Sequence, residues 1–539
     1  MSRSTSEMVI QFHETIGDVP PRLIGASAAL FGSRLYLFGG SMTIGSEQRV
    51  QSDLYVFDLE LWKWEKLFPA AGDPVPKARC FHTTDIWKNY LVLFGGVGAR
   101  DDSTQSDPEL LQDLNDVRLL DLSTRRWLPP PPLPTASSSA PAPRPRHAHL
   151  SCISSNHLYI FGGRDILGDE RDDVWVCDLD KMRWIQKERY PRALDASRAC
   201  AATSRWHALT PPLSPLRPGA TASSISNPLP YSEPATPDSP CDIYLYKVRR
   251  ALDVLSLLTN GELKISPART AQPPSLRFPS GAVLGNTVIL AGNYSAASGL
   301  AIWTLDLTTK TWTHIDTGEL LKHGSWTNGH LWHPHNKFFV FGKRNKTLAS
   351  IVAAAADQLV IEWDDVAVVD MEALGIYQPP AHTLDLPSQR RALAVLANEQ
   401  RADFAFVCED GRQIPCVRAT VAARWPWLEE QLSRVSGASA GITSGKRTTI
   451  TVRQTSCTLA VSYPVTHALL QYFYSLALGT ALQRAPAVLS HLLLVATEFR
   501  IPYLQALALH AMHLALSEAT AAGVFEVAAS CGCRSLQIR

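Results

Sequence analysis

The stretch Leu35–Gly40 has the sequence LYLFGG, and close copies recur as LVLFGG at Leu91–Gly96 and LYIFGG at Leu158–Gly163. Each copy is an apolar run of the length and residue type that form β-strands. Each ends in a glycine pair: Gly39 and Gly40, Gly95 and Gly96, and Gly162 and Gly163. Because glycine tolerates backbone angles and close approaches denied to other residues, we expect these pairs to let neighbouring chains crowd together.

A second strand-like element follows each copy. It has the sequence SDLYVFDL at 52–59, NDVRLLDL at 115–122 and DDVWVCDL at 172–179, and it is followed by Trp64, Trp127 and Trp184, respectively. Each repeat therefore predicts one four-stranded antiparallel sheet, with its tryptophan packed between successive sheets. Since such a sheet cannot bury both faces alone, the copies must stack, and a ring of them protects their edges.

The repeat continues in weaker form toward residue 379. VILAGN at 288–293 precedes Trp312, FFVFG at 338–342 precedes a strand at 365–370, and residues 198–257 fit one more copy that lacks the glycine pair. The last copy lacks a final strand, which Met8–Phe12 can supply. We therefore predict a six-bladed β-propeller over residues 21–379, closed by a strand from residues 1–20.

The order of these elements resembles a known family. Apolar residues followed by Gly-Gly, then an Asp-x-Tyr or Asp-x-Trp strand and a downstream tryptophan, are similar to kelch repeats. The resemblance is strong in three copies and agrees with a structural role for the glycine pairs and for four tryptophans: Trp64, Trp127, Trp184 and Trp312.

Three insertions interrupt the predicted propeller. Residues 101–111 are polar, 129–145 are rich in Pro, Ala and Ser, and 210–240 are rich in Ser and Pro. Such segments bury too little apolar surface to fold, so we expect mobile loops between strands or blades. Thr236 and Ser239, each followed by Pro, are candidate phosphorylation sites, although a plain solvated linker explains them as well.

The pattern changes after Pro379 and Pro380 to Ala- and Leu-rich stretches with helical spacing. Residues 402–416 predict a β-hairpin with an Asp-Gly turn, and a helix follows from about Arg418. This order resembles the opening of a BTB domain, and five residues match that family's pattern: Asp403, Arg418, Arg424, Trp427 and Tyr472. The prediction is a linker at 380–400, an α/β BTB-like domain at 401–484 with an insertion at 436–463, and a helical C-terminal extension at 485–539.

The BTB resemblance implies two kinds of partner. BTB modules often form homodimers, and some bind cullin-3. Val417 and Trp425 depart from the family's usual residues, and the motif linked to cullin binding is not evident after Leu432. A homodimer through this domain is therefore expected, and a cullin-3 ubiquitin-ligase adaptor stays open as an alternative.

The composition limits the partners and the location. With 51 basic and 50 acidic residues, the net charge of +1 gives no electrostatic basis for binding nucleic acid or an anionic membrane. No apolar run approaches the roughly 20 residues that span a bilayer, and Met1–Val19 lacks the apolar core of a signal peptide. The ten cysteines show no CxxC pattern. We therefore expect reduced thiols and a cytoplasmic location, with the cell cortex and the nucleus as alternatives.

The candidate binding residues lie in the turns before the repeats. Six basic positions are assigned there by alignment: Arg22, Arg79, Arg146, Arg198, Arg277 and Lys322. A ring of such side chains could recognise an acidic or phosphorylated peptide. The favoured alternative is that each side chain hydrogen-bonds loop carbonyls within its own blade.

Catalysis has little support in the sequence. His82, His147 and His149 occupy similar turns and could gather around copper, as in a propeller oxidoreductase, but the repeat alone explains their positions. No nucleophile elbow, phosphate-binding loop or paired-carboxylate motif occurs. We therefore predict no enzyme activity, no cofactor and no metal.

The multidomain chain is thus predicted to be a non-enzymatic adaptor: an all-β six-bladed kelch propeller binds a partner protein, and the BTB-like domain dimerises or recruits a second partner. The layout also resembles fungal kelch-BTB regulators of Ras-pathway signalling and cell shape. A metal-dependent propeller oxidoreductase is the alternative from another class.

Overall fold

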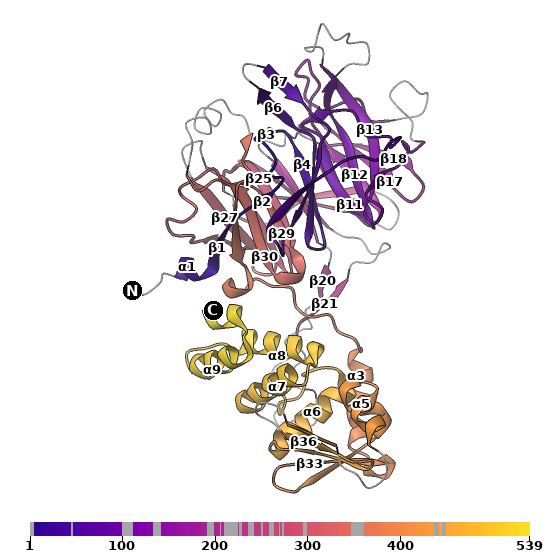
Figure 1. Cartoon of the computed structure of the whole chain (residues 1–539), viewed down its shortest axis with the longest axis vertical. Coiled ribbons are helices and arrows are strands. Elements are labelled where there is room, and N and C mark those ends of the chain that lie inside the picture. The colour runs from indigo at the N-terminus through magenta and orange to yellow at the C-terminus, as the bar shows by residue number, and fades with distance from the viewer. Residues whose placement is uncertain are drawn as a thin grey trace. The chain divides into compact units, whose positions relative to one another are not determined.

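The chain folds into two compact units (Figure 1). The computed structural model describes residues 5–44, 47–99, 111–132, 142–190, 194, 199–204, 206–209, 225, 229–234, 242–248, 252–257, 263–268, 270–271, 274–294, 299–345, 360–435, 441–444 and 449–539. The β-rich unit comprises 1–205 and 235–377, and the α/β unit comprises 206–234 and 378–539. The chain therefore passes from one unit to the other three times.

Within the described ranges, the repeats of the β-rich unit form six antiparallel four-strand arrangements, and three of these contain the strong repeats. The first has β4 (Ser27–Phe31), β5 (Arg34–Phe38), β8 (Leu54–Asp58) and β9 (Lys63–Leu67). The second has β11 (Thr83–Trp87), β12 (Tyr90–Ala99), β13 (Leu111–Asp121) and β14 (Arg126–Trp127), with β10 (Arg79–Cys80) also paired to β12. The third has β15 (Leu150–Ser154), β16 (His157–Phe161), β17 (Asp173–Asp178) and β18 (Arg183–Arg189).

The weaker copies form the other three arrangements. The fourth has β19 (Ala199–Thr203), β22 (Ile243–Lys247), β23 (Asp253–Leu257) and β24 (Leu263–Pro267). The fifth has β25 (Arg277–Leu284), β26 (Thr287–Asn293), β27 (Leu300–Asp306) and β28 (Trp312–Ile315). The sixth has β29 (Thr327–Trp332), β30 (Lys337–Gly342), β32 (Asp365–Asp370) and β1 (Ile10–Glu14).

Short elements complete this unit. Helix α1 (Thr5–Val9) precedes β1, and β2 (Ile16–Gly17) pairs in parallel with β9. A further small sheet has the order β31 (Val360–Ile361), β3 (Leu23–Ile24), β6 (Ser41–Ile44) and β7 (Glu47–Val50).

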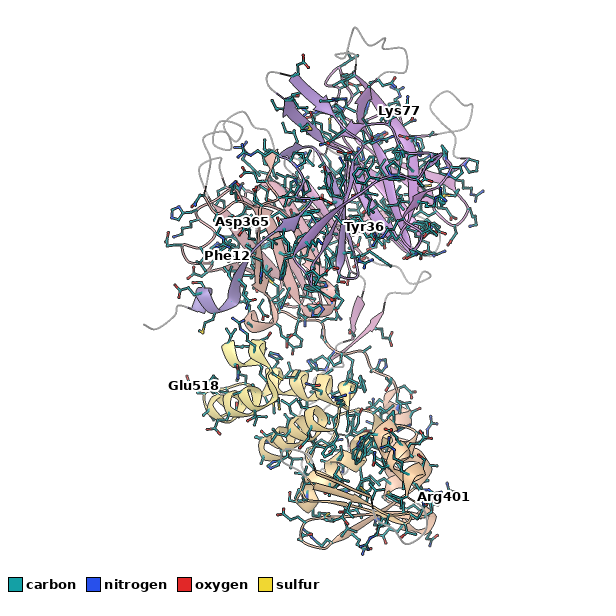
Figure 2. All side chains as sticks on the ribbon, viewed as in Figure 1. Phe12, Tyr36, Lys77, Asp365, Arg401 and Glu518 are labelled. Carbon is teal, nitrogen blue, oxygen red and sulfur yellow. The ribbon has the colours of Figure 1, made fainter. Side chains whose placement is uncertain are left out.

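The first strands of the six arrangements form a cycle. β4 contacts β11, and the contacts continue through β15, β19 and β25 to β29, which contacts β4 again. β1 pairs with β32 from Ile10 opposite Val369 to Glu14 opposite Asp365, so the N-terminal segment supplies the outer strand of the sixth sheet. Figure 2 labels Phe12 and Asp365 on these neighbouring strands. The unit is therefore a propeller-like β structure whose two chain ends share one sheet.

The cores of this unit lie between successive sheets. Trp127 of the second sheet packs against Phe38 of the first, with ring centroids 5.2 Å apart. Trp184 of the third sheet packs against Phe94 of the second at 5.8 Å. Trp64 is fully buried and lies 5.6 Å from Phe341 of the sixth sheet. Each of these tryptophans therefore fills the space against the preceding sheet, whereas Trp312 is only half-buried beside the fourth.

The glycine pairs bring the backbones of neighbouring sheets together. The amide of Gly40 donates to the Arg79 carbonyl at 2.8 Å, Gly96 to Arg146 at 2.9 Å, and Gly163 to Leu194 at 2.8 Å. The first glycine of each pair makes room for this bond. A Cβ on Gly39, which has φ +65°, would lie 2.5 Å from the Arg79 carbonyl oxygen. A side chain there would push the second sheet away from the first.

The expected cost of such a side chain can be measured with two alanine variants. Gly39 and Gly32 have nearly the same φ, +65° and +61°, but a Cβ on Gly32 would meet nothing within 4 Å. Both variants carry the left-handed strain of about 1 kcal/mol, and Gly39→Ala should lose roughly 2 kcal/mol more because of the inter-sheet clash. Chemical denaturation followed by tryptophan fluorescence measures both. Equal losses would contradict the close-approach argument.

The α/β unit has a sheet of five described strands in the order β34 (Gln413–Cys416), β33 (Phe404–Val407), β37 (Ser456–Leu459), β36 (Thr449–Val452) and β35 (Gly441–Ser444). Its helices are α3 (Leu386–Leu396), α4 (Arg418–Ala422), α5 (Pro426–Arg434), α6 (Tyr463–Ser475), α7 (Pro486–Glu498), α8 (Pro502–Ala515), α9 (Ala521–Cys531) and α10 (Arg534–Ile538). Proline occupies the first turn of α5, α6, α7 and α8, where its fixed φ suits helix entry. Helix α6 is buried on nearly all sides, so it forms the centre of this unit. Among the described helices, none has the length and apolarity to cross a membrane.

The structure differs from the sequence-based expectation at two insertions. Within 210–240, strand β21 (Tyr231–Pro234) pairs with β20 (Trp206–Leu209) and belongs to the α/β unit. Its residues fold because the α/β unit covers them, which composition alone could not indicate. Within 436–463, β36 and β37 are strands of the five-stranded sheet. Other parts of the predicted insertions lie outside the described residues: 101–110, 133–141, 210–224, 226–228, 235–240, 436–440 and 445–448, with Thr236 and Ser239 among them.

Candidate functional site

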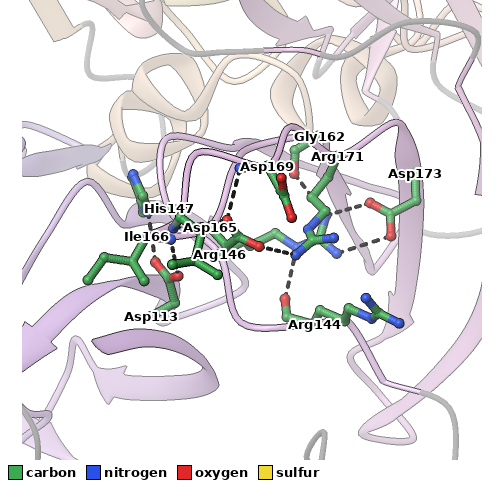
Figure 3. Close-up of polar contacts among 11 residues, drawn as sticks. Asp113, Arg144, Arg146, His147, Gly162, Asp165, Ile166, Asp169, Arg171 and Asp173 are labelled. Carbon is green, nitrogen blue, oxygen red and sulfur yellow. Dashed lines mark hydrogen bonds and ion pairs between the residues drawn. The ribbon is translucent and has the colours of Figure 1, made fainter. Parts of the chain in front are cut away.

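Two arginines that precede the second and third repeats are fully buried. Arg79 makes a bidentate ion pair with Asp116, at 2.7 and 2.9 Å, and donates to the Gly95 carbonyl at 3.0 Å. Arg146 repeats this arrangement with Asp173, at 2.6 and 3.1 Å, and with the Gly162 carbonyl at 2.8 Å (Figure 3). Both guanidinium groups therefore bind a carboxylate and the glycine turn of their own sheet.

The position of Arg79 and Arg146 is filled differently in other repeats. Two residues after each arginine, the backbone is left-handed: φ is 55° at Phe81 and 50° at Ala148. In other repeats, the residue two places before a left-handed position is a buried apolar one: Leu23, Leu276 or Trp326. Arg22 and Arg277 therefore lie one residue away from the position that the sequence alignment gave them. A buried apolar side chain therefore replaces the arginine in these repeats.

The remaining predicted basic residues have other contacts. Arg22 is 42% exposed and pairs with the buried Glu362 at 2.8 Å. Arg277 lies over the Phe278 ring, 5.6 Å from its centroid. Lys322 is exposed, and its hydrogen bond to Glu319 raises the pKa of its amine. Arg198 lies outside the described residues. The role of these residues in partner binding stays a prediction.

Two of the three histidines lie between sheets. His82 packs edge-on against Phe38 and His149 against Phe94, with ring centroids 5.6 and 5.1 Å apart. Burial, followed by the nearby Arg79 charge, lowers the pKa of His82 to about 3. Burial also lowers the pKa of His149 well below its ordinary value. Both rings are therefore neutral packing groups at physiological pH.

The third histidine supports an exposed loop (Figure 3). His147 Nδ1 lies 2.7 Å from one oxygen of Asp113, whose other oxygen accepts the Ile166 amide at 2.6 Å. Asp165 accepts the amides of Leu167 and Asp169, at 3.1 and 2.9 Å, and pairs with Arg171. We call residues 164–170 the knuckle loop. Its amides at 166, 167 and 169 all donate to carboxylates, while the side chains of Ile166 and Leu167 are 52% and 86% exposed.

Phe81 is a further exposed apolar residue, and it lies near His147. It is 38% exposed despite its left-handed backbone, and its ring centroid lies 6.2 Å from that of His147. Its amide donates to Gly25 at 2.7 Å, and its carbonyl accepts from Ala148 at 3.0 Å. Neighbouring sheets thus hold Phe81 in a conformation that a bulky residue rarely adopts. The sequence analysis did not identify Phe81 or the knuckle loop, although Ile-Leu-Gly within a polar stretch was a visible signal.

Comparison with known proteins agrees with the repeat geometry. A model of the KLHDC2/KLHL20/DRC7 Kelch-repeats domain matches residues 3–208. Protein ral2 of Schizosaccharomyces pombe is 23% identical over 602 aligned residues, which cover 100% of this chain and 94% of ral2. Human Kelch domain-containing protein 1 is 30% identical over 216 residues, covering 37% of this chain and 49% of that protein. These matches support kelch repeats in the N-terminal part of the chain. Human Host cell factor 2, 31% identical over 177 residues, shares a segment that covers 32% of this chain and 22% of its own.

In the first repeat, a lysine pairs with the aspartate that corresponds to Asp116 and Asp173. Asp53 corresponds to Asp116 and Asp173. Its carbonyl accepts a hydrogen bond from the Gly39 amide at 3.0 Å, and the Asp173 carbonyl accepts one from the Gly162 amide at the same distance. With Leu23 at the arginine position, Lys66 pairs with Asp53 at 2.7 Å, and this hydrogen bond raises the pKa of Lys66. The sequence analysis missed Lys66, Asp53 and Glu362.

The residues matched outside the kelch repeats lie close together in the α/β unit. Asp403 accepts the Arg418 amide at 2.7 Å at the start of α4. Arg424 donates to the carbonyls of Phe473 and Tyr474 in the last turn of α6, where a cation is favourable. Tyr472 is buried and Trp427 is half-buried. Trp425 is fully buried and stacks on Phe473, with centroids 5.2 Å apart.

Metal binding finds no support in the described residues, because none of them form a group of three or more His, Cys, Asp or Glu side chains that could hold an ion. Each of the three histidines has the other contacts given above.

The buried His82 should make stability depend on pH. Its pKa falls from 6.5 to about 3 on folding, so its contribution is fully present above pH 6.5 and is lost as the pH falls toward 3. At pH 5 the loss should be about 2 kcal/mol. His82→Leu should flatten the fall in unfolding free energy between pH 7 and pH 5, as measured by chemical denaturation.

The matched control is His323→Gln, because the side chain of His323 is 81% exposed. This variant should keep the wild-type pH dependence. An unchanged slope in His82→Leu would contradict the assignment of His82 as a buried neutral group.

Proposed function

We propose that this protein is a non-enzymatic adaptor in which a six-bladed kelch propeller binds a partner protein and a BTB-like unit dimerises or recruits a second partner. The observation that carries the proposal is the knuckle loop, which exposes Ile166 and Leu167 on a scaffold of satisfied polar groups. A loop that is already ordered loses little conformational freedom when it binds. Exposed apolar side chains on such a loop suit the centre of a protein interface.

The six-bladed propeller is supported by the cycle of contacts among β4, β11, β15, β19, β25 and β29. The strand β1 supports closure, since it joins the first residues of the chain to the last sheet. Closure would remove free sheet edges and fix the loops at the ends of the strands.

The BTB-like assignment of the α/β unit is supported by the contacts of Asp403 and Arg424 with α4 and α6. These are the residues on which the sequence resemblance was based. We propose homodimerisation through this unit, and a cullin-3 adaptor remains the rival within the same class. Binding of purified cullin-3 by the full-length protein would favour that rival.

The partner surface is proposed to combine the knuckle loop with Phe81, with Arg22 and Lys322 as accessible basic groups. Arg79 and Arg146 would contribute indirectly, since their side chains are fully buried in ion pairs. Their part would be to fix the turns that carry Phe81 and His147.

The setting of the adaptor is proposed from the sequence resemblance to fungal kelch-BTB regulators of Ras-pathway signalling and cell shape. The similarity to protein ral2 of Schizosaccharomyces pombe along the whole chain supports a shared architecture. A location in the cytoplasm, at the cell cortex or in the nucleus agrees with this proposal.

The test compares one double serine variant and one single serine variant in affinity purification of the full-length protein from its own cells. Ile166→Ser with Leu167→Ser should reduce recovery of the specific partners at least about tenfold, because two buried apolar side chains at an interface centre contribute several kcal/mol. Quantitative mass spectrometry measures the recovery.

The control is Leu61→Ser, since Leu61 is 64% exposed and lies on the turn between β8 and β9, at the opposite ends of the strands. This variant should retain the partners. Equal recovery from all variants would contradict the knuckle loop as the binding surface.

A further inference from the structure

The connection between β19 and β22 is unlike its counterparts. In the first three sheets the first and second strands are joined by tight turns, as between Phe31 and Arg34 or Ser154 and His157. β19 and β22 are equally adjacent, with Ala199 opposite Lys247, yet residues 204–242 connect them. Of the described residues in this connection, 206–209, 225 and 229–234 belong to the α/β unit.

Residues 225 and 229–234, which we call the latch segment, belong to the α/β unit, and two of them contribute to its core. Leu229 is 3% and Tyr231 5% exposed, and both join the hydrophobic cluster that contains α6, α7 and α8. The Tyr231 ring stacks on His382, with centroids 5.9 Å apart. A surface loop would leave such side chains in water, so this segment is a structural part of the unit.

Backbone hydrogen bonds fix the register of the latch segment. The amide of Ser232 donates to the Pro380 carbonyl at 3.1 Å, and the fully buried Ser232 hydroxyl donates to the Pro379 carbonyl. On its other side, β21 pairs with β20, placing Ser232 opposite Ala208. Strand β21 of the latch segment therefore has backbone partners on both of its edges.

Side chains of the helices complete this binding site. His510 of α8 is buried, and its Nε2 lies 2.7 Å from the Pro230 carbonyl. Burial lowers the pKa of His510 to about 4, so the neutral ring donates this hydrogen bond at physiological pH. Tyr503, also on α8, donates to the Ala381 carbonyl at 2.7 Å and so holds the strand that pairs with Ser232.

A second contact lies at the other end of the latch segment. Ile225 forms an antiparallel bridge with Thr480, which follows α6. A Cβ on the neighbouring Gly479 would lie 3.1 Å from Ile225. The absence of a side chain at Gly479 thus leaves room for Ile225.

We propose that the α/β unit contains a recognition groove for an extended Leu-Pro-Tyr-Ser segment, and that the chain fills this groove with its own latch segment. The latch then joins the two halves of the chain independently of the link at 377–378. A cut at that link would leave the fragments 1–377 and 378–539 bound to each other through Leu229, Tyr231 and Ser232.

The experiment uses the full-length protein with a specific protease site inserted between Tyr377 and Gln378. After cleavage, the wild-type fragments should co-elute in size-exclusion chromatography and separate only in denaturant. Tyr231→Ala should weaken their association about 100-fold or more, because the variant loses a buried aromatic side chain. Phe525→Ala is the matched control, since Phe525 of α9 is an aromatic residue that is 55% exposed, and its fragments should stay together.

A second pair of variants separates loss of the latch from loss of folding. His510→Leu removes the donor to Pro230, whereas His510→Gln can replace it, so only the first should speed fragment release. Circular dichroism of each protein before cleavage checks that it is folded. A synthetic peptide of residues 225–234 should accelerate release when added in excess, and a scrambled peptide should not.

Two results would overturn the proposal. Separation of the wild-type fragments directly after cleavage would mean that the latch does not hold them. Continued association of folded Tyr231→Ala fragments, as tight as in the wild type, would mean that other contacts do.

Discussion

The close approach of each glycine pair to the next sheet is the constraint on which the β-rich unit depends. The amides of Gly40, Gly96 and Gly163 reach carbonyls in the following repeat only because the preceding glycines have no side chain. This contact sets the distance at which the tryptophans fill the space between sheets. The contact also fixes the turns that contain Arg79 and Arg146. These arginines pair with Asp116 and Asp173 and donate to the carbonyls of Gly95 and Gly162, so each also holds the glycine turn of its own sheet.

The sequence predicted best those features that recur in nearly the same form in each strong repeat. LYLFGG and its copies indicated the second strands, the glycine pairs and the tryptophans, because each repeat imposes the same packing requirement. The basic positions were harder to predict. Alignment on the basic residue placed Arg22 and Arg277 beside Arg79, whereas alignment on the left-handed backbone places Leu23 and Leu276 there. An ion pair and an apolar side chain satisfy the same buried position, so residue type alone could not set the register.

The latch segment was beyond sequence reasoning for a different reason. Leu229 and Tyr231 stand in a stretch rich in Ser and Pro that shows no periodicity. They are buried in a core that is formed by helices far away in the chain. The knuckle loop presents a similar case, because its order comes from Asp113 in the preceding repeat. Both segments belong to loops that a rigid scaffold positions, and such loops are where binding residues concentrate in proteins.

The central claim is that glycine-mediated hydrogen bonds make the sheets of the β-rich unit one cooperative structure. Native-state hydrogen exchange of the Gly40, Gly96 and Gly163 amides tests it most directly, because each bonds to the next sheet. We expect these amides to exchange only through global unfolding, with the same opening free energy as central amides of β5, β12 and β16. Exchange of the glycine amides at much lower opening free energy, with separate values for each sheet, would contradict the account.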